Sequence, residues 1–124
     1  MLDHIGLEVA DLQRSARFYD ALFARLGIRR VFESEAAIAY GSHEPRLWIV
    51  ERGRGPGPGF GHVAIAASGR AAVDAAYAAA REAGGHDDGD TGPPALRPQY
   101  GSRYYAAYLL DPDGLRVEVV AGGH

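Results

Sequence analysis

Two stretches of the chain, residues 3–10 and 60–67, alternate between apolar and polar side chains. A period of two is typical of a strand with one buried face. Each stretch is followed by apolar residues at helical spacing, which predicts an amphipathic helix after each strand. Asp11 is a suitable N-cap for a first helix of about 15 residues, and Gly27 is a suitable left-handed terminator.

The second helix is expected to begin at Ser68 or Gly69 and to end at Gly84-Gly85. Shorter apolar segments bounded by turn residues predict the remaining strands. These strands are placed at residues 28–33, 36–40, 46–51, 103–110 and 115–121, with a short edge strand near residues 86–90. The predicted element order is therefore β-α-β-β-β in each half of the chain.

The two halves match each other without a gap. A shift of 58 positions lays His4 on His62 and Tyr19 on Tyr77. A shift of 70 positions lays residues 36–50 on residues 106–120. Chance similarity between alternating strands is the alternative, but the His and Tyr matches share one frame, which favours an internal duplication.

The duplication predicts an α+β protein with a single domain over residues 1–124. Module one covers residues 1–52, a linker rich in Gly and Pro covers residues 53–59, and module two covers residues 60–121. Such a linker allows the modules to pack within one chain or to exchange between two chains. The sequence does not decide between these arrangements.

The composition restricts the class of protein further. The chain has 124 residues, of which 47% are hydrophobic, and a net charge of −3, which indicates a globular domain without a nucleic-acid partner. It has no cysteine, which excludes disulfides, a thiol nucleophile and zinc–thiolate sites. No apolar run approaches the roughly 20 residues of a membrane span, and the N-terminus has no signal-peptide pattern. We therefore expect a cytoplasmic protein with no membrane partner.

Three potential metal ligands fall at related positions of the two modules. His4 and His62 occupy the same position on the first strand of each module, and Glu118 lies on the last strand of module two. Val117 and Val119 face the core, so Glu118 faces the same side as His62. Two imidazoles and one carboxylate suit a divalent Fe, Mn, Ni, Co or Zn ion and leave coordination positions open.

A structural role is the alternative for each of these residues taken alone. Each histidine would then pack under a loop, and Glu118 would pair with an arginine such as Arg116 or Arg103. The occurrence of two imidazoles and a carboxylate in one duplicated frame favours the metal site.

Three segments of the chain resemble the vicinal-oxygen-chelate superfamily: HIGLEVADLQRSARFYDALFARLGI, GFGHVAIAASGRAAVDAAYAAAREAGG and YYAAYLLDPDGLRVEVV. This superfamily includes glyoxalase I, methylmalonyl-CoA epimerase, extradiol dioxygenases, fosfomycin-modifying enzymes and bleomycin-binding proteins. The resemblance covers essentially the full chain, and DLQRSARFY and LDPDGLRVEV are its most specific parts. It implies paired β-α-β-β-β modules whose mixed sheets form a cup around a metal ion, and a homodimer.

The resemblance also implies roles for individual residues. His4, His62 and Glu118 match the metal-ligand positions of the family. The fourth ligand position of glyoxalase I falls at Trp48, which cannot bind a metal ion, and the nearby Glu51 lies on the opposite strand face. Members with three ligands, such as extradiol dioxygenases and fosfomycin thiol transferases, tolerate this loss.

Four residues are candidates for catalysis or substrate binding. Tyr108 stands ten positions before the carboxylate ligand, where three-ligand members carry a tyrosine. It would donate a hydrogen bond to a bound oxyanion or act in acid–base steps, and a role as an aromatic wall is the alternative. Strand parity places Trp48 and Tyr104 on the same lining, where they would stack on a planar ligand. Arg103 is a nearby cation and the fourth candidate.

Two functions are consistent with these features. The first is a divalent-metal-dependent lyase, isomerase or dioxygenase that acts on a small oxygenated or aromatic metabolite. Residues 97–100 lack the histidine base of catechol-cleaving dioxygenases, and the two arginines near them are few for a phosphonate site. The alternative is a binding protein that sequesters an aromatic ligand without catalysis. A degenerate scaffold that only dimerises is a third option.

Overall fold

A strand, a helix and further strands occur twice along the chain, in a computed structural model that describes residues 1–53, 61–89 and 92–123. The first module contains β1 (Ile5–Glu8), α1 (Leu12–Ala24), β2 (Arg29–Glu33), β3 (Ala37–Gly41) and β4 (Leu47–Val50). The second contains β5 (His62–Ala66), α2 (Arg70–Glu82), β6 (His86–Asp87), β7 (Ala95–Leu96), β8 (Tyr105–Leu110) and β9 (Arg116–Ala121). The predicted α+β fold is confirmed, and most of the predicted linker lies outside the described residues.

Each module forms its own mixed sheet. The described strands are ordered β1-β4-β3-β2 in module one and β5-β9-β8-β6 in module two, where β7 also pairs with β8. In both sheets the first strand runs parallel to the last strand, and the other pairs are antiparallel. The hydrophobic pattern predicts every strand except β7, whose two residues are too few to show a period.

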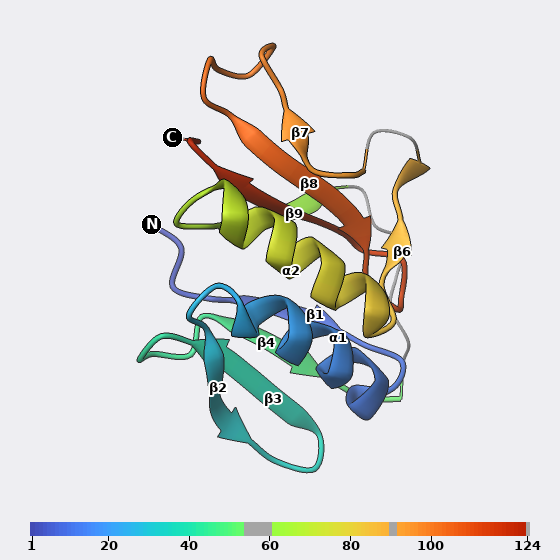
Figure 1. Ribbon diagram of the computed structural model, residues 1–124. Coiled ribbons are helices and arrows are strands. Elements are labelled where there is room, and N and C mark those ends of the chain that lie inside the picture. The colour runs from blue at the N-terminus through green and yellow to red at the C-terminus, as the bar shows by residue number, and fades with distance from the viewer. Residues whose placement is uncertain (54–60, 90–91, 124) are drawn as a thin grey trace.

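The two helices lie side by side at the centre of the molecule, and Figure 1 shows the module-one sheet below them and the module-two sheet above. The bounds of α1 and α2 differ by 58 at both ends, as the duplication predicts. The Asp11 carboxylate accepts a hydrogen bond from the Arg14 backbone N–H at 3.0 Å, which confirms the predicted cap. No helix among the described residues is long and apolar enough to cross a membrane.

The duplicated frame needs correction at two places. Gly27 has a φ of 72°, as expected of a left-handed terminator, but its counterpart in module two is Gly84, with a φ of 106°, and not Gly85. In module one, Ala39 of β3 pairs with Trp48 of β4. A shift of 70 takes these two residues to Leu109 and Glu118, which would then pair in module two.

The residue paired with Glu118 is Tyr108. The shift between β3 and β8 is therefore 69 and not 70. The turn between the two residues of the last β3–β4 pair has six residues, 41–46, whereas the turn between those of the last β8–β9 pair has five, 111–115. Because this hairpin is one residue shorter, every β8 side chain lies on the face of the sheet opposite to the one that a shift of 70 would give.

The helices bury one apolar face each and contact one another closely. On α1 the fully buried side chains include Phe18, which the helical pattern does not single out, and on α2 the core-facing residues are Val73, Ala76 and Ala80. The small alanines allow α2 to pack closely against β8 and β9. A Cβ atom at Gly85 would lie 2.8 Å from the Phe18 ring, so the chain passes tightly between the modules there.

The turn between β8 and β9 is anchored to the first module. The Tyr19 hydroxyl donates a hydrogen bond to the Asp111 carboxylate at 2.7 Å, and Asp113 accepts one from Arg14 at 2.8 Å. Both Tyr19 and Asp111 are buried, and burial raises the pKa of each group. These contacts hold the two modules of one chain together through their helix side.

Replacing Tyr19 with phenylalanine is expected to lower the free energy of unfolding by about 1.5–3 kcal/mol, because the buried Asp111 carboxylate loses its hydroxyl donor. Urea unfolding measures this loss. It should shrink as the pH falls and Asp111 becomes protonated, since the lost bond stabilises the ionised form. The repeat-related Tyr77→Phe is the control: its hydroxyl contacts the exposed Asp87, so we expect a change within about 0.5 kcal/mol. Equal losses in the two variants would contradict this interpretation.

Candidate functional site

On the sheet of module two, the imidazole of His62 contacts the buried carboxylate of Glu118. His62 begins β5 and Glu118 lies in the adjacent β9, where Val117 and Val119 belong to the core and Glu118 faces the other way. His62 Nε2 lies 3.1 Å from Glu118 Oε1. The Glu118 side chain is 2% exposed and that of His62 is 42% exposed, so the imidazole borders solvent while the carboxylate does not. Among the described residues, no arginine forms an ion pair with Glu118.

Tyr104 holds the second oxygen of the same carboxylate. Its hydroxyl lies 2.5 Å from Glu118 Oε2. Burial and this hydrogen bond to Glu118 raise the pKa of Tyr104, so the phenol stays protonated and acts as the donor. Tyr104 therefore orients Glu118, a role that its position in the sequence does not predict.

Tyr108 lies beside this pair, directly opposite Glu118 in the β8–β9 register. Its ring is edge-on to the His62 ring with 6.1 Å between centroids. The guanidinium groups of Arg97 and Arg116 lie over the same ring, at 5.2 and 4.2 Å from its centroid. Burial, followed by the nearby Glu118 charge, raises the pKa of Tyr108, and its hydroxyl makes no hydrogen bond within the described part of the chain.

His4 is the predicted ligand that does not join the others. It is exposed just before β1, and its Nδ1 lies 2.7 Å from the carboxylate of its neighbour Asp3. Among residues 1–53, 61–89 and 92–123, no group of three or more His, Cys, Asp or Glu side chains is arranged to hold a metal ion. The chain therefore brings two of the three predicted ligands together.

The remaining candidates lie apart from the His62–Glu118 pair or at its edge. Trp48 is in the other sheet, where its ring lies 5.2 Å from that of the exposed Phe32. Arg103 is exposed. Its backbone carbonyl oxygen lies so close to Gly122 that a side chain at position 122 would collide with it. The two arginines over Tyr108 take the place beside the pair that was predicted for Arg103.

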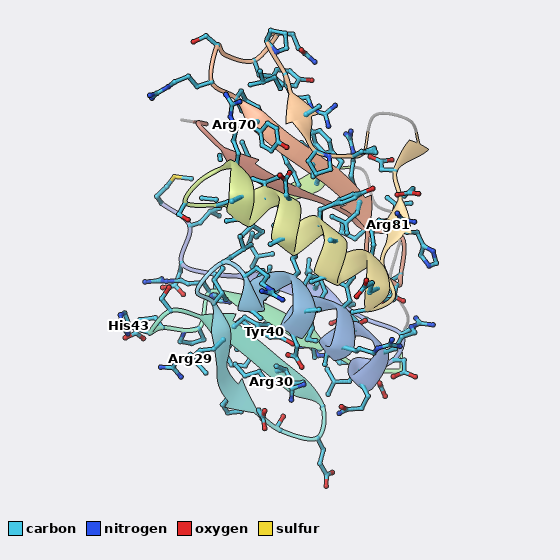
Figure 2. All side chains as sticks on the ribbon, viewed as in Figure 1. Arg29, Arg30, Tyr40, His43, Arg70 and Arg81 are labelled. Carbon is cyan, nitrogen blue, oxygen red and sulfur yellow. The ribbon has the colours of Figure 1, made fainter. Side chains whose placement is uncertain are left out.

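A separate cleft of about 560 Å³ lies in module one between α1 and β2. Figure 2 shows Arg29, Arg30 and Tyr40, which border it, on the side of the molecule away from module two. The Asp20 carboxylate in this cleft already accepts two hydrogen bonds from Arg30 and one from Tyr40. Its polar groups are thus satisfied by one another, and the cleft offers no second candidate for catalysis.

Comparison with known proteins identifies the family. The sequence profile of the Glyoxalase/Bleomycin resistance protein/Dioxygenase superfamily matches residues 1–119. A glyoxalase/bleomycin resistance protein from Albidiferax ferrireducens is 31% identical, with a TM-score of 0.84 and 98% of each chain covered. The chain therefore belongs to this superfamily, as its motifs indicate. No curated protein matches it.

Two more distant structures share the fold. The fosfomycin resistance protein FosX from Mesorhizobium loti has 20% identity and a TM-score of 0.71, with 98% of this chain and 92% of that chain covered. A glyoxalase I mutant from Zea mays has 22% identity and a TM-score of 0.71, with 95% of this chain but 46% of that chain covered. The present chain thus spans about half of the maize protein.

Proposed function

We propose that the chain is a divalent-metal-dependent enzyme acting on a small oxygenated or aromatic metabolite, with a site shared between two copies of the chain. The observation that carries this proposal is the His62–Glu118 pair: a buried carboxylate, held by an imidazole and a phenol at the open face of a sheet. A buried carboxylate in this setting requires a cationic partner, and none of the described arginines pairs with it.

The donor chemistry fits a metal ion in part. One imidazole nitrogen and one carboxylate oxygen already lie 3.1 Å apart, and they suit Fe, Mn, Ni, Co or Zn in the divalent state. The second oxygen of Glu118 is fixed by Tyr104, as the outer partners of metal-binding carboxylates usually are. One more protein ligand is needed, and His4 of a second chain is the candidate.

The strand edges support this assembly. β1 pairs with β4 and β5 pairs with β9, and on their other sides the described residues leave both strands without a partner. Unpaired strand edges favour association with another chain. A twofold homodimer that sets β1 of one copy beside β5 of the other would bring His4 to the His62–Glu118 pair twice.

A bound metal ion would act as a Lewis acid toward two neighbouring substrate oxygens. The chain's own residues supply the remaining functions. Tyr104 keeps Glu118 in one orientation by donating a hydrogen bond to Oε2. The Tyr108 hydroxyl, which makes no hydrogen bond among the described residues, would donate to an oxygen of the substrate where negative charge develops, and its raised pKa keeps that proton in place at neutral pH.

Metal binding can be tested with Tyr104→Phe, which leaves both ligands but removes the hydroxyl that orients one of them. Calorimetric titration with Mn²⁺, Co²⁺ and Zn²⁺ should show one ion per wild-type chain. The variant should bind about 10–100-fold more weakly. Tyr105→Phe is the matched control, because that neighbouring hydroxyl contacts Asp74 on the α2 side. A wild-type protein that binds none of the metals would contradict the proposal.

A ligand-sequestering protein without catalysis is the second candidate. The Phe32–Trp48 pair on the open face of module one favours it, because Phe32 is 45% exposed and offers an aromatic surface to a planar ligand. Trp48 is the single tryptophan of the chain, so its fluorescence reports on this surface. Quenching by planar ligands in metal-free protein, together with absent metal binding, would favour sequestration over catalysis.

A further inference from the structure

We infer that Arg97 binds a carboxylate group of the ligand, which makes the ligand of this site a small organic acid. The inference rests on the proposed function only in placing the ligand at the open face of module two. The anion contact itself requires no metal ion.

Arg97 differs from the other half-buried arginines in the described part of the chain. Arg30 pairs with Asp20 at 2.7 Å, and Arg116 pairs with Asp88 at 2.5 Å. Arg97 is also half-buried, but no carboxylate among the described residues lies within ion-pair distance of it. A partly buried cation without a counter-ion is costly, and an anionic ligand would offset that cost.

The Arg97 guanidinium is held in one place. Its Nη2 donates to the Pro93 carbonyl at 2.9 Å and to the Ala106 carbonyl at 3.1 Å. Its Nε is buried without an acceptor among the described residues, and Nη1 makes no hydrogen bond there either. The guanidinium is therefore preorganised, and its Nη1 group is left to donate to a carboxylate oxygen of a ligand.

The position of Arg97 links it to the His62–Glu118 pair. Its guanidinium lies over the ring of Tyr108, and that ring is edge-on to His62. Arg116 lies over the same ring but is neutralised by Asp88. Among the described residues, the positive charge beside the site that has no carboxylate partner thus belongs to Arg97, and the Tyr108 hydroxyl, which makes no hydrogen bond among them, provides a further donor.

The surface next to Arg97 suits an aromatic acid as a probe. The rings of Tyr100 and Tyr104 lie 5.4 Å apart, and Tyr100 is 57% exposed. Aromatic rings in offset or edge contact stabilise one another beyond the area they bury. Benzoate therefore combines the carboxylate with a ring of the right kind, and benzamide is its neutral match.

The test compares calorimetric binding of benzoate and benzamide to the metal-free full-length protein. Wild-type protein should bind benzoate about tenfold more tightly than benzamide, because one contact is charge-assisted. Arg97→Gln should abolish this preference, and Arg97→Lys, which keeps the cation but not the fork, should retain part of it. The matched control Arg25→Gln removes an exposed arginine of module one and should keep the wild-type preference.

Two outcomes would overturn the inference: no benzoate preference in the wild-type protein, or a preference that survives in Arg97→Gln. If Arg97→Gln fails to fold, the comparison of the wild type, Arg97→Lys and Arg25→Gln decides, because Arg97→Lys is the only one of the three without the Arg97 guanidinium. The outcome is independent of metal binding. A metal-free protein that prefers benzoate supports the inference even where the metal proposal fails.

Discussion

Chains carrying His4→Ala and chains carrying Glu118→Ala are expected to bind metal only when they are combined. In a shared site, each variant alone lacks a ligand in both of its sites. In a mixed dimer, one site receives the intact His4 of one chain and the intact His62 and Glu118 of the other. Random association then restores about one quarter of the wild-type sites, because half of the dimers are mixed and each holds one complete site.

Co-expression of the two variants, followed by metal analysis of the purified protein, provides the measurement. Each variant expressed alone is the first control and should bind at least about 100-fold more weakly than the wild type. A second control pairs His43→Ala with Glu118→Ala, since His43 is an exposed residue outside the site. Full binding by His4→Ala alone would show that this histidine is not a ligand. No recovery in the mixture would show that all ligands come from one chain.

Phe18→Ala is expected to lower the free energy of unfolding by about 3–5 kcal/mol. Phe18 is completely buried on α1 and makes an edge contact with Tyr19 at 4.9 Å. It also lies against Gly85, at the point where the chain leaves α2. The substitution opens a cavity between the two modules that the closely packed helices cannot fill.

Urea unfolding of wild-type and variant protein measures this effect. Phe32→Ala is the matched control, because Phe32 is 45% exposed on the open face and its loss should change stability by about 0.5 kcal/mol or less. A loss below about 1 kcal/mol for Phe18→Ala would contradict the observed packing of the helices within one chain. The shared metal site depends on this packing within one chain, because β1 and β5 are then edge strands, with no partner on their other side among the described residues.

Local patterns in the sequence predict most of this fold. The period of two along β5 and the helical period along α2 show which side chains face the core, because these periods follow from backbone geometry alone. Asp11 and Gly27 mark the ends of α1 through short-range hydrogen bonding and a positive φ. The two-residue β7 has no period, so the sequence could not reveal it.

The register of the last hairpin was predicted wrongly for a physical reason. A shift of 70 matches β4 with β9, but a turn shorter by one residue moves β8 out of that frame. Hairpin register depends on turn length, which a gapless repeat hides. Tyr108 nevertheless lies on the same face of the sheet as Glu118, because the face of a side chain depends on the alternation along its own strand and not on the repeat.

The sequence by itself determined the superfamily, the two β-α-β-β-β modules and the common side on which His62 and Glu118 lie. The superfamily is indicated by the resemblance of three segments, whereas the modules and the common side follow from residue spacing along single elements. The tertiary structure alone decided that Tyr104 holds Glu118, that Arg97 lies over Tyr108 without a counter-ion, and that His4 stands apart from the other two ligands. These features depend on how loops and modules meet in space, and side-chain contacts between distant segments have no signature in the spacing of one chain.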